Sequence, residues 1–138
     1  MKSQFSNFAI ATFCSLQSLV IPYNSNLYCC TIYQLLYNIE GNIDSLKSRR
    51  KIDYIKCGLN ELIDNNVISK INEIQKHYIL DCSKLWVDTN NTKYTVISLN
   101  EVKKIFEISN INNFLLLRYF ILLVGTISNK INVCLENG

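Results

Sequence analysis

The stretch Asp44–Leu80 decides the fold, and it reads DSLKSRRKIDYIKCGLNELIDNNVISKINEIQKHYIL. In its first half, apolar residues recur at the three- and four-residue spacing of a helix that buries one face. These apolar residues are Ile52, Ile55, Leu59, Leu62 and Ile63. The spacing predicts that Leu59 and Leu62 lie in the core and that Lys56 and Asn60, on the other side, are exposed.

The second half of this stretch predicts a two-stranded ribbon. Asp64-Asn65-Asn66 ends the helix, and apolar residues resume at Val67–Ile71. A turn is expected at Asn72–Lys76 and a second strand at His77–Leu80. A winged helix has this order at its recognition helix and wing. Gly58 lies beside the buried face, where the missing side chain lets another helix come close.

On the amino-terminal side, the chain predicts a further helix from about Asn26 to Ile39. Gly41 follows it and is suited to a left-handed helix cap. Ser48 can cap the next helix, and the pattern leaves open whether residues 44–64 form one helix or two. A helix-turn-helix needs two.

On the carboxyl-terminal side, β-branched and aromatic residues predict a hairpin between Leu85–Val87 and Tyr94–Ile97. Ser98 then begins a helix, with Glu101 three residues later as in a capping box. A last helix is expected from Ile111 to Ser128, and the alternation of apolar residues after it is typical of the start of a strand.

The domain organisation expected from these elements has three parts. Residues 1–23 are an apolar segment, ambiguous between helix and extended chain, that packs on the domain. Residues 24–98 form an α+β winged helix-turn-helix with a β-hairpin wing. Residues 99–138 form a C-terminal helical extension, with the possible start of a second domain. Segment 8–22 lacks a signal-peptide cleavage site, and 114–127 is shorter than the roughly 20 residues that a membrane span needs, so we expect no membrane association.

The charge of the chain is concentrated at the start of the central helix. The full chain has a net charge of +3, whereas residues 47–56 hold five cations and Asp53 as the single acid. Such a patch can bind phosphate. The alternative is that these residues are the solvent-exposed start of a helix and bind nothing. Asp53, Glu61 and Asp64 are expected on the exposed side of the helix, where carboxylates repel phosphate. The candidate DNA-binding residues are Lys47, Arg49, Arg50, Lys51, Lys56, Asn60, Lys70 and Lys76.

Catalytic and metal chemistry find little support in the sequence. His77 is the single histidine and falls in a predicted strand, and no nucleophile elbow, zinc-protease motif or phosphate-binding glycine loop occurs. The six cysteines include no C-x-x-C pair, which argues against zinc. We expect reduced, half-buried thiols, no cofactor and no enzyme.

Four runs of the chain carry a resemblance: GLNELIDNNVISKI (58–71), YILDCSKLW (78–86), YTVISLNEVKKIF (94–106) and NNFLLLRYFILLVGTIS (112–128). Their order resembles the amino-terminal winged-helix region of replication-initiator and DnaD-like proteins from bacterial plasmids, phages and conjugative elements. The resemblance covers about residues 27–128. It implies DNA contact by the helix of residues 49–64 and by the wing near Lys70–Lys76.

The function expected from these observations is binding of double-stranded DNA in replication or control of a mobile element, in the bacterial cytoplasm. The alternative is a protein-interaction module with a degenerate winged helix and no DNA binding. The helix Ile111–Ser128 is apolar on more than one side. It therefore predicts either that the chain is a fragment of a longer protein or that it self-associates through this helix.

Overall fold

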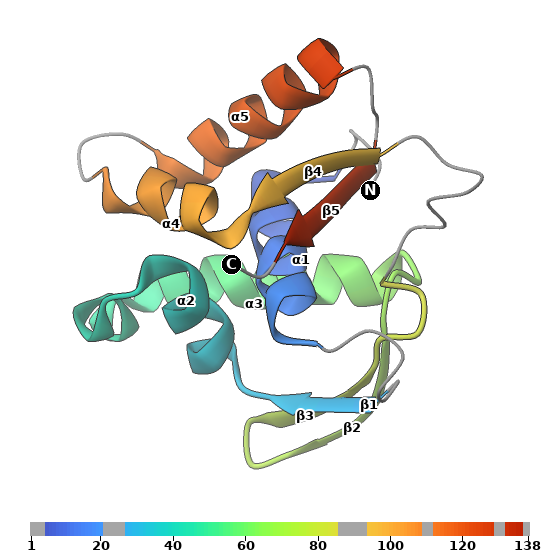
Figure 1. Ribbon diagram of the computed structural model, residues 1–138. Helices are drawn as coiled ribbons and strands as arrows, with labels where there is room; N and C mark the ends of the chain where they lie inside the picture. Colours follow the sequence, from blue (N-terminus) through green and yellow to red (C-terminus); the bar gives the residue numbers. More distant parts are fainter. Residues whose placement is uncertain (1–4, 21–26, 86–93, 109–111, 129–131, 137–138) are drawn as a thin grey trace.

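The computed structural model describes residues 5–20, 27–85, 94–108, 112–128 and 132–136. In Figure 1, three helices, α1, α2 and α3, lie between a three-stranded sheet and the strand pair β4–β5. The α+β class is confirmed, and the layout is consistent with a winged helix. The elements are α1 (Asn7–Leu19), β1 (Leu27–Cys30), α2 (Ile32–Glu40), the 3-10 helix η1 (Ile43–Lys47), α3 (Arg49–Asp64), β2 (Ser69–Ile74), β3 (His77–Asp81), β4 (Tyr94–Ser98), α4 (Leu99–Glu107), α5 (Asn113–Ser128) and β5 (Asn132–Glu136).

Helix α1 resolves the ambiguity of the amino-terminal segment. The hydroxyl of Ser6 accepts a hydrogen bond from the Ala9 N–H and caps the helix. Every residue from Ala9 to Gln17 is buried, because α1 packs against α2, α3 and α5 at once. The apolar segment is therefore a central helix of the core.

Gly58 of α3 lies close against α1. A Cβ atom at this position would lie 2.3 Å from the Phe8 carbonyl oxygen and 2.5 Å from the Thr12 hydroxyl. The same hydroxyl donates to the Phe8 carbonyl at 2.8 Å. The expectation that Gly58 admits a neighbouring helix is confirmed.

The three-stranded sheet has the order β1-β3-β2 and is antiparallel throughout. Strands β2 and β3 form the expected hairpin, but the turn is shorter than predicted and consists of Gln75 and Lys76 at positive φ. Positive φ at both positions matches the twist of a two-residue hairpin turn. All residues of β2 are exposed, so this strand is a solvent-facing edge.

Strand β1 corrects the prediction of a helix from Asn26 to Ile39. Leu27–Cys30 pairs with β3, with Cys30 opposite Tyr78, and α2 begins only after Thr31. Thr31 and Gln34 form a capping box there. Pairing with a strand far along the chain therefore overrides the local helical pattern. Helix α2 ends at Gly41 with φ +68°, as expected.

Residues 44–64 form two helices rather than one. The 3-10 helix η1 ends at Ser48, and the hydroxyl of the same serine accepts from the Lys51 N–H to begin α3. One residue therefore closes the first helix and caps the second.

Strand β4 pairs with a strand that the sequence did not indicate as its partner. It pairs in parallel with β5, with Tyr94 opposite Asn132, whereas we expected a hairpin with Leu85–Val87. Leu85 is buried in a turn that follows β3, and residues 86–93 lie outside the described part. The alternation in the carboxyl-terminal segment is confirmed as a strand.

Helices α4 and α5 follow the predicted caps closely. The Ser98 hydroxyl accepts from the Glu101 N–H as expected, and Asn112, slightly later than predicted, caps α5 through the Leu115 N–H. Arg118 of α5 donates to the Phe5 carbonyl at 2.7 Å and to the Asn7 side chain. Among the described helices, none is long and apolar enough to cross a bilayer.

Candidate nucleic-acid interface

Helix α3 divides into a buried and a polar side, as the sequence predicts. Ile55, Gly58, Leu59 and Leu62 are buried, and Leu59 has no exposed surface. Away from the buried side, the exposed residues of α3 are Arg49, Arg50, Asp53, Lys56, Cys57, Asn60 and Asp64. The prediction that Leu59 and Leu62 are core and that Lys56 and Asn60 are exposed is therefore confirmed.

The basic cluster at the start of α3 does not form one surface. Lys47 forms an ion pair with Asp44 at 3.6 Å. Lys51 lies 2.9 Å from the carboxylate of Glu40, whose side chain is only 5% exposed. A cation held by a nearly buried carboxylate is poorly available to phosphate, so Lys51 belongs to the packing between α2 and α3.

Arg49 and Arg50 are neighbours in sequence but lie about 100° apart around the helix. Arg50 lines a cavity whose other walls come from α4 and α5. Lys56 lines a separate hollow that faces the hairpin. Arg50 and Lys56 were both predicted to contact DNA, but the structure places them in different hollows.

The hollow between α3 and the hairpin brings two of the predicted residues together. Lys56 of α3 and Lys76 of the hairpin turn both line it, and so do Asp53 and Glu73. The hollow has a volume of about 170 Å³. Its complete lining is Ile32, Tyr33, Ile52, Asp53, Lys56, Glu73, Lys76 and Tyr78.

Lys70 is committed to the hairpin itself. Its ammonium group lies 3.4 Å from the carboxylate of Glu73. This exposed pair contributes little stability, but it neutralises one of the two acids beside Lys56 and Lys76. The sequence could not indicate the pair, because it depends on where the bulge in β2 falls.

Glu61 corrects the expected distribution of acids on α3. Its carboxylate accepts a hydrogen bond of 2.8 Å from the Ser6 N–H at the start of α1, and the residue is half-buried. A negative charge at a helix amino terminus is stabilising. Glu61 therefore supports α1 and does not join Asp53 and Asp64 on the exposed side.

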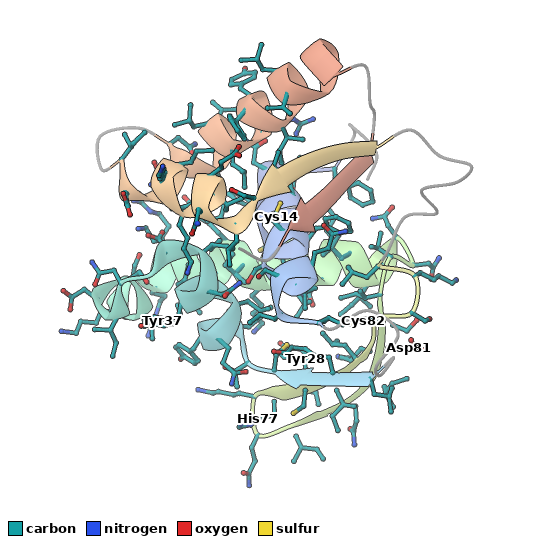
Figure 2. All side chains as sticks on the ribbon, viewed as in Figure 1. Cys14, Tyr28, Tyr37, His77, Asp81 and Cys82 are labelled. Atoms are coloured by element: carbon teal, nitrogen blue, oxygen red, sulfur yellow. The ribbon has the colours of Figure 1, made fainter. Side chains whose placement is uncertain are left out.

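The thiols and the single histidine lie apart from this hollow. Burial raises the pKa of Cys14 and of Cys30 from 9.0 to about 12, and the pKa of Cys82 to about 11. Figure 2 shows Cys14 on the central helix and His77 on the hairpin. The described cysteines are free, and the described residues include no group of His, Cys, Asp and Glu that could hold a metal ion. His77 is exposed, with Nδ1 3.1 Å from the Gln75 carbonyl.

No protein-family model, no curated protein and no solved structure matches this chain. Any functional assignment therefore depends on the arrangement of its own elements and side chains. Sequence reasoning missed Tyr33 and Tyr78, which line the hollow with the lysines. Tyr33 belongs to α2 and Tyr78 to β3, and no local pattern in the sequence indicates that the fold brings these two residues beside α3.

Proposed function

We propose that this chain is a winged-helix protein that binds double-stranded DNA with α3 and the β2–β3 hairpin. The observation that carries the proposal is the element order α1-β1-α2-α3-β2-β3 with the sheet order β1-β3-β2. In a winged helix with this order, the helix before the hairpin is the one that enters the major groove.

The side chains on α3 and the hairpin support a backbone-contacting surface. Lys56 and Lys76 lie on opposite walls of one hollow, where both ammonium groups can reach a single phosphate strand. Asn60 is exposed one turn farther along α3, and an asparagine amide can pair with the edge of adenine. Asp53 limits the affinity, so binding is expected to be weak at high salt.

The salt dependence of binding tests this proposal. We expect the double variant Lys56→Ala/Lys76→Ala to lose two phosphate contacts. The slope of log K against log salt should then shrink by about 1.8, at about 0.9 per contact. Fluorescence anisotropy of a labelled duplex, titrated between low and moderate salt, measures the slope.

Two matched variants sharpen this test. Lys84→Ala removes an exposed lysine outside the hollow and should leave the slope unchanged. Arg49→Ala, on the exposed side of α3, should reduce the slope by about 0.9, which corresponds to one phosphate contact. Lys51→Ala should reduce the slope less, because Lys51 is paired with Glu40. If the native protein does not retain duplex at low salt, the DNA-binding proposal is wrong.

A role in replication or control of a plasmid, phage or conjugative element is the narrower form of this proposal. It rests on the resemblance of the four sequence runs alone. The cytoplasmic location and the absence of catalysis likewise stay predictions.

The second candidate function is an interaction module that assembles with a second copy of the chain. It is favoured by α5, on which Leu115, Tyr119 and Leu123 are exposed at four-residue intervals. The described side chains of α5 include one cation, Arg118, and it donates hydrogen bonds to Phe5 and to Asn7 at the start of α1. An uncharged stripe of this kind can pack on its own copy. A concentration-independent monomer in sedimentation velocity would exclude this candidate.

A further inference from the structure

A second cavity lies at the opposite side of α3 from the hairpin. It has a volume of about 670 Å³, within the range of small-molecule sites. The ends of α2 and α4 and the starts of α3 and α5 meet around it. Its lining is Glu40, Asn42, Arg50, Lys51, Tyr54, Phe106, Glu107, Asn112, Asn113 and Phe114.

Aromatic rings form one part of this lining. Phe114 lies edge-on to Phe106 with ring centres 5.2 Å apart and edge-on to Tyr54 at 5.5 Å. Phe8 stacks on Tyr54 at 4.3 Å and lies edge-on to Phe114 at 5.4 Å. Because these rings hold one another, they offer a rigid apolar surface, and a planar heterocycle gains free energy by packing on such rings.

Two buried side-chain oxygen atoms in the lining accept no hydrogen bond from the described residues. One is Oε1 of Glu40, whose contact among these residues is the ion pair with the Lys51 ammonium group at 2.9 Å, and the other is the amide oxygen of Asn113. The Asn113 oxygen has no such charged neighbour, and a buried acceptor without a donor costs free energy. The terminal torsions of both side chains are broad, so a small rotation can present either oxygen to an N–H group on a ligand.

Arg50 supplies a cation at the same cavity. Its guanidinium forms no ion pair or hydrogen bond with the described residues, and it is exposed. Arginine suits phosphate because its planar N–H groups match two phosphate oxygens. The lining therefore combines a stacking surface, acceptors for N–H groups and a phosphate-binding cation.

We propose that this cavity binds an amino-bearing purine nucleotide. The base packs on Tyr54 and Phe114, its N–H groups face Glu40 and Asn113, and its phosphate contacts Arg50. This site is independent of the DNA-binding hollow, since Lys56 and Lys76 take no part in its lining.

Calorimetric titration of the full chain with guanosine monophosphate tests the proposal. Guanosine, which lacks the phosphate, and ribose 5-phosphate, which lacks the base, should each bind at least tenfold more weakly. The variant Arg50→Ala should weaken guanosine monophosphate by about tenfold or more and leave guanosine unchanged. Arg49→Ala, the adjacent exposed arginine outside the lining, is the matched control and should keep the native affinity.

Proton NMR of the ligand provides a measurement that does not depend on a variant. The guanine ring proton should move upfield on binding, because it would lie against aromatic rings. The proposal is overturned if millimolar guanosine monophosphate gives neither heat nor a shift, if ribose 5-phosphate binds equally well, or if Arg49→Ala weakens binding as much as Arg50→Ala. Lys56→Ala/Lys76→Ala should keep nucleotide affinity, so failure of the DNA proposal and failure of this one are distinguishable.

Discussion

Helices α3 and α5 are both 16 residues long, but they meet the rest of the protein in different ways. Helix α3 buries Leu59 and Leu62 and presents polar residues on its other side. Helix α5 buries Phe114 and Leu117, yet its other side is also apolar, with Tyr119 60% and Leu123 59% exposed.

This difference shows what a sequence pattern can specify about a helix. Contrast between apolar and polar positions identifies the buried side of α3, because the two kinds of residue alternate with the helical period. Helix α5 has little such contrast, so its orientation follows from contacts with α1, α4 and β4. When a helix is apolar on all sides, the part of its surface that no neighbouring element covers remains apolar and exposed.

The largest effect should come from the buried side of α3. Leu59→Ala should lower the free energy of unfolding by about 2–5 kcal/mol, since Leu59 is fully buried and leaves a cavity. Its counterpart Leu123→Ala on the exposed side of α5 should change it by no more than about 0.5 kcal/mol. Urea denaturation of both variants measures the difference, and equal losses would contradict the assignment of faces.

A smaller effect is expected where α1 meets α3. Gly58→Ala should destabilise the protein by about 1–3 kcal/mol, because the new methyl group would collide with the Phe8 carbonyl. The sign is informative, since a helical glycine replaced by alanine ordinarily gains about 1 kcal/mol. Cys57→Ala, one residue earlier and exposed, serves as the control. A stabilised Gly58→Ala variant would mean that the two helices are farther apart.

The smallest effect concerns the thiols at mildly alkaline pH. The folded pKa of Cys14 is about 12 against 9.0 for an accessible thiol, so the folded state holds its proton more tightly. The resulting stability is complete below pH 9 and is lost as the pH rises from 9 toward 12. From pH 8 to 9 the loss should be only about a few tenths of a kcal/mol. Thermal unfolding across this range measures it. Cys14→Ala should make the profile shallower by this amount, while the losses from Cys30 and Cys82, whose pKa values burial also raises, remain.

Much of the local structure was predictable from the sequence. The faces of α3, the hairpin after it and the cap at Ser98 all depend on residues within a turn or two of one another. Periodicity, capping side chains and turn residues act over that distance, so the chain itself determines them. The same signals identified Lys56 and Lys76, which the fold brings together.

Only the tertiary structure decided the rest. Leu27–Cys30 became a strand because β3 accepts its hydrogen bonds. Glu61 left the polar side of α3 because the Ser6 N–H, 55 residues away, needed an acceptor. Lys51 was removed from the basic cluster by Glu40. In each of these cases the two interacting groups are distant in the sequence, and no local sequence pattern indicates that they will meet. They follow from the burial of polar groups, which must find partners wherever the packed core brings them.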